Sequence, residues 1–214
     1  MNRVIFSDIL KRLDFDVPEE SIDTFAKYVD LLRKSSLSLN LLSSGEVGHI
    51  WERHILDSLW PIILGVFKPN SSILDVGTGA GLPGIPLAIC SPSLKVVMVE
   101  SVGKKARFIE RAVSSLSINN SSVVNTRIED YRPEILFDYC TSRAFASIEK
   151  SLPLFTPFVE PSGEIIFYKG PDSLREISDA RHLLPSLNLS SPEIIKIPSF
   201  SPSKGFNLVV YKRR

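Results

Sequence analysis

A glycine-rich segment and one acidic residue carry the clearest chemical signal in this chain. The segment Asp75–Pro86 reads DVGTGAGLPGIP and follows a short apolar run that we expect to be a buried strand. Gly77, Gly79 and Gly81 allow the backbone to turn tightly and to approach a ligand without a Cβ in the way. The helix predicted after them points free N–H groups at an anionic group. Glu100 ends the next apolar run, and its carboxylate can accept hydrogen bonds from two vicinal hydroxyls, as on a ribose.

Two nucleoside cofactors compete for this loop. Gly79, Gly81 and Gly84 fit the G-x-G-x-x-G fingerprint of NAD-binding proteins, which has an acidic residue about 20 positions further on. In the other register, the segment Asp75–Gly81 resembles the first motif of S-adenosylmethionine-dependent methyltransferases. The strand Ile73–Val76 stops directly before Gly77, which favours the methyltransferase register. NAD binding and a loop without any ligand remain the alternatives.

The elements that position these residues alternate between strands and helices from residue 71 onward. Helical patterns at Gly103–Leu116 and Ile148–Phe158 lie between strands, whereas only Pro198–Lys204 separates the last two strands. Such alternation is typical of βαβ units. We therefore predict an α/β, Rossmann-like, mostly parallel seven-stranded sheet with an antiparallel C-terminal hairpin. The predicted strands are Ser72–Val76, Lys95–Val99, Ser122–Asn125, Phe137–Thr141, Glu164–Tyr168, Glu193–Ile197 and Asn207–Lys212.

The first third of the chain has helical patterns and no strand signal. One helix would carry Ile5, Ile9, Leu10 and Leu13 on one face, and a second would start after Pro18. A serine- and leucine-rich connection over Ser35–Ser44 and a third helix over Glu46–Trp60 would follow. We predict a helical extension (residues 1–67) packed on a main domain (residues 68–214).

Composition narrows the class of protein. The 214 residues are 43% hydrophobic and carry a net charge of +1, which excludes a histone-like or polyacidic protein but not a local RNA-binding face. The two cysteines, Cys90 and Cys140, cannot make a disulfide framework or a four-ligand zinc site. No apolar run approaches the roughly 20 residues of a membrane span. We expect a cytoplasmic protein without a membrane segment and without an obligate protein partner.

Longer sequence motifs resemble those of one family specifically. The run Asp75–Ala88 resembles the first motif of the RsmG family, also called glucose-inhibited division protein B. The similarity extends from about residue 40 to the C-terminus. Supporting words are Arg53–Ser58, Ser101–Lys105, Ser142–Ala146 and Lys169–Gly170. The resemblance implies a class I methyltransferase fold and S-adenosylmethionine-dependent methylation of a guanine N(7) in 16S ribosomal RNA of the small subunit.

The same resemblance implies roles for individual residues. Gly77 and Leu82 would line the cofactor, and Ile128 and Glu129 would hold its adenine end. The alternative for the latter pair is an ordinary strand-to-helix loop with a solvated acid. Arg143, after the fourth predicted strand, would bind the cofactor carboxylate or an RNA phosphate through its guanidinium, or form a structural salt bridge instead.

Candidate RNA contacts are basic: Arg53, His54, Lys104, Lys105 and Lys169. Arg53 and His54 are implied by the resemblance alone. Lys104 and Lys105 open a run that continues with Arg107 and Arg111. Such a run is usually a solvated face, but at the mouth of the crevice it could collect phosphates and make binding salt-sensitive.

Two places depart from the family pattern. Asn40-Leu41-Leu42 lacks a hydroxyl that the family often has, and Phe206-Asn207 stands where Arg-His is common. If that pair touches RNA, we expect Lys204 or the tail Lys212–Arg214 to replace it. The aromatic residues Phe145, Phe167 and Tyr168 are interpreted as core residues rather than base-stacking platforms.

No catalytic base can be named, and none is expected. Guanine N(7) carries a lone pair and no proton, so alignment with the methyl donor is the main requirement. We see no nucleophile elbow or paired carboxylates of a hydrolase. No metal site is expected, because His49 and His54 are spaced to face different sides of a helix. The remaining alternatives are a methyltransferase for a small molecule or protein, and a non-catalytic RNA-binding protein.

Overall fold

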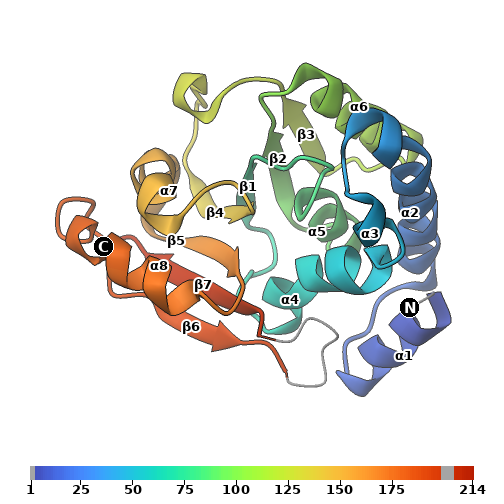
Figure 1. Cartoon of the computed structure of the whole chain (residues 1–214), viewed down its shortest axis with the longest axis horizontal. Coiled ribbons are helices and arrows are strands. Elements are labelled where there is room, and N and C mark those ends of the chain that lie inside the picture. The colour runs from blue at the N-terminus through green and yellow to red at the C-terminus, as the bar shows by residue number, and fades with distance from the viewer. Residues whose placement is uncertain (1–2, 199–204) are drawn as a thin grey trace.

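One mixed β-sheet organises the molecule (Figure 1). The computed structural model describes residues 3–198 and 205–214. Within these residues seven strands lie in the order β3-β2-β1-β4-β5-β7-β6. β1 to β5 pair in parallel, whereas β7 runs antiparallel to both β5 and β6. The predicted sheet and its antiparallel C-terminal hairpin are therefore confirmed. The strands are β1 Ser72–Val76, β2 Lys95–Val99, β3 Ser121–Val124, β4 Phe137–Arg143, β5 Val159–Lys169, β6 Glu193–Lys196 and β7 Asn207–Lys212.

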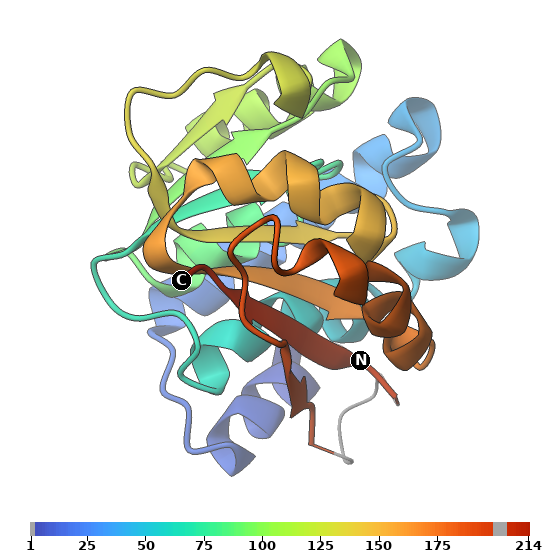
Figure 2. The same ribbon diagram turned by 90° about the vertical axis from the view of Figure 1, so that its left-hand side faces the viewer.

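Helices cover both faces of the sheet. Successive residues of a strand point to opposite faces, so Ile73 packs with one hydrophobic core and Leu74 with the other. The first core joins the sheet to α5 (Gly84–Cys90), α6 (Gly103–Ser115) and the N-terminal helices. The second joins it to α7 (Ile148–Phe155) and α8 (Ser173–Ala180). In Figure 2 the orange helices α7 and α8 face the viewer, and the blue N-terminal helices lie behind and beside the sheet.

The N-terminal segment begins with α1 (Arg3–Arg12) and α2 (Glu19–Leu39). The prediction of a connection from Ser35 was wrong, because α2 continues four residues beyond it. Ser36 is fully buried and its hydroxyl donates to the carbonyl of Leu32, so the helix is retained by packing despite its serines. It ends at Asn40, which adopts the left-handed conformation with φ 51°, as is common after a helix.

The single third helix predicted over Glu46–Trp60 is also corrected. The chain forms a short α3 (Ser44–Val47), a π-helical turn (Trp51–Leu56) and α4 (Asp57–Ile63). Ser43 and Glu46 form a capping box that starts α3, which ends at Gly48. π-Helical turns are rare and often lie at functional sites. This one carries Arg53 and His54.

Two strands are longer than predicted. β4 reaches Arg143, and β5 begins at Val159, which pairs with Phe137 before a register shift in the ladder. Short 3₁₀ turns occur at Ile128–Asp130, Thr156–Phe158 and Arg181–Leu183. Among the described residues, none of the helices is long and apolar enough to cross a membrane. The same residues contain no group of three or more His, Cys, Asp or Glu side chains that could hold a metal.

Candidate functional site

The glycine loop occupies the carboxyl end of β1 in a left-handed backbone conformation. Gly77, Gly79 and Gly81 have φ values of +68°, +61° and +89°, a region that side chains with a Cβ rarely adopt. Asp75 holds the loop from below: its Oδ2 accepts a hydrogen bond of 2.8 Å from the N–H of Gly84. The carboxyl group is fully buried, and this burial raises the pKa of Asp75 to about 6. The loop is thus preformed by the strand that precedes it.

Glu100 ties this loop to the end of β2. Its Oε2 accepts from the N–H of Gly79 and its Oε1 from the N–H of Val102, both over 2.8 Å. Only 5% of the residue is exposed. A carboxylate oxygen has a second lone pair, so accepting from a ribose hydroxyl remains chemically open. The structure adds a role that sequence reasoning missed: Glu100 orients the loop itself.

A small cavity opens between this loop and the segment after β3. Its volume is about 140 Å³. Gly77, Ile128 and Glu129 line it together, and Ile128 is buried while Glu129 is exposed at the rim. Leu82 does not line it, because its side chain packs in the hydrophobic core. The complete lining is Val76, Gly77, Val99, Ser101, Thr126, Arg127, Ile128, Glu129 and Phe145.

Phe145 forms the outer wall of this cavity. A Cβ placed on Gly77 would lie 2.5 Å from Cδ2 of the Phe145 ring, so the ring covers the glycine. The interpretation of Phe145 as a core residue was wrong: the residue is 39% exposed, whereas Phe167 and Tyr168 are buried. The preceding Ala144 has φ 59°, which turns the chain at the end of β4 and swings Phe145 over the loop. No local hydrophobic pattern signals such a turn.

Arg143 and His54 form a pair that the sequence did not indicate. Nη2 of Arg143 lies 2.7 Å from Nδ1 of His54, and Nη1 donates to the carbonyl of Arg53 over 3.2 Å. His54 is only 4% exposed. Burial, reinforced by the Arg143 charge, lowers the pKa of His54 to about 4, so the ring is neutral at pH 7. Burial also lowers the pKa of Arg143, against the opposing charge of Asp57.

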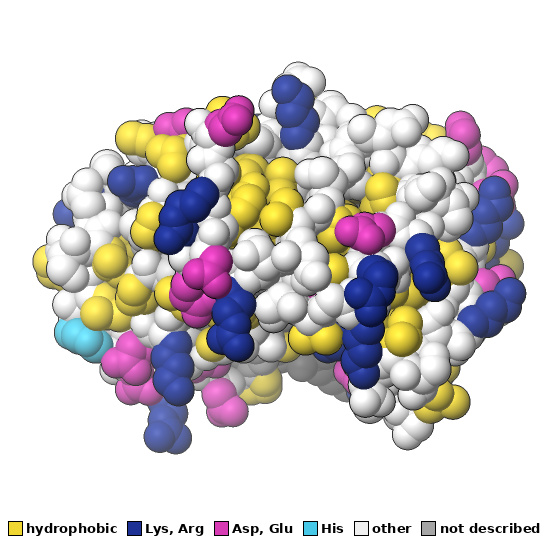
Figure 3. Space-filling view, turned by 90° about the horizontal axis from the view of Figure 1, so that it is seen from above, with side chains coloured by type: hydrophobic (Ala, Val, Ile, Leu, Met, Phe, Trp, Pro, Cys, Tyr) yellow, Lys and Arg dark blue, Asp and Glu magenta, His cyan; other side chains and the backbone are white. Residues whose placement is uncertain are grey.

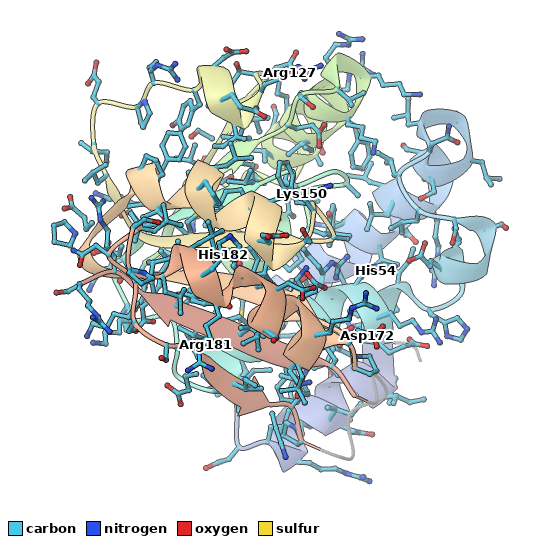
Figure 4. The ribbon with its side chains drawn as sticks, turned by 60° about the vertical axis from the view of Figure 1, so that its left-hand side comes forward. His54, Arg127, Lys150, Asp172, Arg181 and His182 are labelled. Atoms are coloured by element: carbon cyan, nitrogen blue, oxygen red, sulfur yellow. The ribbon has the colours of Figure 1, made fainter. Side chains whose placement is uncertain are left out.

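His54 therefore cannot present its ring to RNA in this arrangement, unlike the exposed Arg53. The predicted RNA contact at His54 is replaced by an interior contact with Arg143. Figure 4 shows His54 between helices α7 and α8 and the blue N-terminal helices, with Arg127 at the opposite, upper end. The Arg143–His54 pair therefore lies apart from the cavity, whose lining includes Arg127 but neither member of the pair.

The predicted basic contacts differ in their surroundings. Lys104 is exposed and Lys105 half-buried at the start of α6. Lys169, in contrast, is tied down at the end of β5: its ammonium donates to the carbonyl of Ala146 over 3.0 Å and pairs with Glu176 over 2.7 Å. Its side chain is 12% exposed. Lys169 therefore braces the loop that carries Phe145.

The C-terminal tail lies at the wrong end of the sheet for the role we expected. Because β7 is antiparallel to β5, Asn207 pairs with Lys169 at the crevice, whereas Lys212 pairs with Glu164 at the opposite edge. Arg213 binds the carbonyls of Thr156 and Val159 there. At the crevice end, Phe206 packs against Tyr168 with ring centroids 5.8 Å apart. Lys204 lies outside the described residues.

The fold and this loop define a class of protein. A parallel sheet with an antiparallel β7 between β5 and β6, a glycine loop after β1 and a carboxylate after β2 make this chain a class I S-adenosylmethionine-dependent methyltransferase. The same fold occurs in an S-adenosylmethionine-dependent O-methyltransferase from Thermotoga maritima, with a TM-score of 0.59 and 15% identity over 74% of this chain and 64% of that one.

The chain belongs to the GidB family, rRNA small subunit methyltransferase G, whose model matches residues 21–198. It is 33% identical to the ribosomal RNA small subunit methyltransferase G of Alteromonas mediterranea over 87% of this chain and 88% of the relative. The protein of the same name from Clostridium kluyveri is 30% identical over 98% of this chain and 89% of the relative. The resemblance inferred from the sequence words is thereby confirmed, and the methyltransferase register of the loop with it.

Proposed function

We propose that this protein methylates N(7) of a guanine in 16S ribosomal RNA of the small ribosomal subunit, in the cytoplasm. The observation that carries the cofactor part is the cavity at the strand ends, where Gly77, Ile128 and Glu129 converge beside Glu100. The Phe145 ring lies where a Cβ of Gly77 would be, so a ligand can lie against the bare backbone of Gly77 once this ring moves aside. The family supplies the rRNA substrate class.

Each residue then has a specific task. S-adenosylmethionine supplies an electrophilic methyl group. Apolar packing by Ile128 and a carboxylate at Glu129, which can accept a hydrogen bond from the amino group, suit an adenine ring. Glu100 accepts from ribose hydroxyls while holding Gly79, and Arg143, held by His54, offers its guanidinium to the carboxylate of the cofactor.

The cavity is smaller than a usual ligand pocket, so part of the site must open to admit the cofactor. Ligand pockets usually measure about 300–1,000 Å³, whereas this one measures about 140 Å³. Phe145 is the wall that lies over Gly77 and is itself partly exposed. We assign to Phe145 the movement that admits the cofactor.

The reaction needs no general base from the protein. N(7) of guanine presents a lone pair, so the protein must orient it toward the methyl group and keep water out. Orientation of this kind is worth roughly 7–11 kcal/mol in favourable intramolecular reactions. A guanine stacked in a helix cannot reach the crevice, so an unpaired or extruded guanine is required.

A methylation assay with a modified transcript tests the acceptor atom. Purified protein is incubated with labelled S-adenosylmethionine and a 16S transcript, and with a matched transcript in which 7-deazaguanosine replaces guanosine. We expect incorporation into the first and none into the second, because the second lacks N(7). Equal incorporation would show that another atom is methylated. Small ribosomal subunits serve as a parallel substrate, which decides between naked RNA and an assembled particle.

Titration calorimetry tests the cofactor independently of RNA. S-adenosylmethionine should bind with micromolar affinity and NAD should not bind. Binding of NAD instead would return the glycine loop to the dinucleotide alternative. Binding of S-adenosylmethionine without RNA methylation would favour a small-molecule or protein acceptor.

A further inference from the structure

A second groove lies between the N-terminal helices and the methyltransferase sheet. Its walls are α2 on one side and α6 on the other, and its volume is about 400 Å³. It shares no lining residue with the cavity beside Gly77. The lining consists of Leu31, Ser35, Leu39, Lys104, Arg107, Phe108, Arg111, Ala112 and Ser115.

The charge of this groove is entirely positive. Lys104, Arg107 and Arg111 are exposed along α6, and the lining contains no Asp or Glu. Within residues 3–198 and 205–214, no ion pair involves any of the three cations. Lys169 differs in this respect, because Glu176 neutralises it. Three unpaired cations in one groove favour a polyanionic ligand.

The spacing of these cations suits a nucleic-acid strand. At 1.5 Å per residue, positions 104 to 111 span about 10 Å along the helix. Phosphates of a stacked strand follow one another at about 3.4 Å of rise, so a span of about 10 Å covers about three phosphate steps and each of the three side chains can reach a phosphate. The apolar floor of Leu31, Leu39 and Phe108 offers contact to sugars and bases, which a site for a free anion would not need.

The start of α6 connects this groove to the segment that holds the cofactor loop. α6 starts at Gly103, directly after Val102, whose N–H binds Glu100. Arg107 turns back toward this start: its Nη1 lies 3.4 Å from where a Cβ of Gly103 would be. Figure 3 shows Lys and Arg side chains on both sides of this face, including the side on which α2 and α6 lie in Figure 1, with Asp and Glu side chains among them.

We propose that the α2–α6 groove binds the sugar–phosphate backbone of the RNA strand that flanks the target guanine. This inference rests on the proposed function and extends it, because it makes α2 of the N-terminal segment one wall of the substrate track. Arg107 and Arg111 are the phosphate contacts furthest from the crevice, and the strand leaves the active site along α6.

A charge-reversal experiment tests the proposal. The double variant Arg107→Glu/Arg111→Glu is compared with the matched control Arg12→Glu/Lys95→Glu, which reverses two exposed charges on α1 and at the amino end of β2. For each protein we measure the KM for RNA, the salt dependence of RNA binding, and the affinity for S-adenosylmethionine. The milder Arg107→Gln/Arg111→Gln variant guards against misfolding.

The groove variants should raise the KM for RNA at least tenfold and reduce the slope of log K against log salt by about 1.4, or about 0.7 per phosphate on a single strand. Their affinity for S-adenosylmethionine should stay within twofold of wild type, and the control should match wild type throughout.

Two results would overturn the proposal and leave the proposed function intact. One is an unchanged KM and salt slope in variants that still methylate RNA. The other is a defect seen only with assembled subunits and not with naked RNA, which would assign the groove to a ribosomal protein. If the wild-type protein binds S-adenosylmethionine but methylates no RNA, the proposed function fails and this inference fails with it.

Discussion

Arg143 and His54 lie 89 residues apart in sequence, and their side chains meet over 2.7 Å between Nη2 and Nδ1. The contact links the end of β4 to the π-helical turn of the N-terminal segment. Because His54 is neutral at pH 7, its Nδ1 accepts the hydrogen bond instead of repelling the guanidinium. His54 is thus a positioning residue for Arg143 in the proposed cofactor site.

Removing the acceptor at position 54 should weaken cofactor binding. We expect His54→Leu to raise the Kd for S-adenosylmethionine about tenfold, equivalent to about 1.4 kcal/mol, since a hydrogen bond to a charged group is worth about 1.5–3 kcal/mol. His54→Asn, whose amide oxygen can replace Nδ1, should recover most of the affinity. Titration calorimetry measures both, and equal affinities in the two variants would contradict a positioning role.

The protonation of His54 predicts a pH dependence of stability with a definite sign. Its pKa is about 4 in the folded protein against 6.5 ordinarily, so between these values the unfolded chain binds a proton that the folded chain does not. His54 therefore makes stability rise with pH from about 4 to 6.5, by up to about 3 kcal/mol in all.

Asp75 makes stability fall as pH rises, which is the opposite direction. Its pKa is raised from 3.8 to about 6, so the folded protein keeps this proton to a higher pH than the unfolded chain does. The difference between wild type and His54→Asn isolates the contribution of His54 to the pH dependence of stability, because Asp75 is present in both proteins. Urea unfolding at several pH values between 4.5 and 7.5 should show that the free energy of unfolding of wild type increases relative to that of the variant as pH rises. A nuclear magnetic resonance titration that finds His54 titrating near 6.5 would refute this account.

Replacing Glu100 by glutamine should damage both the loop and ligand binding. A glutamine has only one side-chain acceptor oxygen, so its amide group would face the N–H of either Gly79 or Val102. Leaving that N–H unsatisfied costs about 1–3 kcal/mol of stability, and we expect at least a tenfold loss of S-adenosylmethionine affinity. Glu110→Gln, at an exposed position on α6, is the control. Wild-type affinity in Glu100→Gln would remove Glu100 from the ligand site.

A methyl group at position 77 should block the site for two separable reasons. Gly77→Ala places a Cβ 2.5 Å from the Phe145 ring and forces alanine into φ +68°, a conformation that costs about 1–2 kcal/mol. We expect loss of S-adenosylmethionine binding and a lower free energy of unfolding. Adding Phe145→Ala relieves the contact but not the backbone strain, so stability should recover only in part. Gly45→Ala, with nothing within 4 Å of the added Cβ, should behave like wild type; full recovery in the double variant would mean that the strain at residue 77 is negligible.

The sequence by itself determined the sheet and the loop. Strands such as Ser72–Val76 and Lys95–Val99 were predicted to the residue, because buried strands carry local apolar runs bounded by turn residues. Gly77, Gly79 and Gly81 were informative for a similar reason. A left-handed backbone position usually requires glycine, so the conformation can be predicted from the residue at that same position. The division into residues 1–67 and 68–214 and the individual ligand roles stay predictions.

Only the tertiary structure decided which side chains face one another. No local sequence pattern predicts the hydrogen bond between His54 and Arg143. The same is true of the position of Phe145 over Gly77 and of the ion pair between Lys169 and Glu176. The reversed direction of β7 carried Lys212 to the edge away from the crevice, although its sequence neighbours belong to a strand that was predicted correctly. Packing also overrode local preference, extending α2 through its serines and breaking the helix expected over Glu46–Trp60. These outcomes depend on contacts between distant segments, which form only when helices and sheet close around a common core.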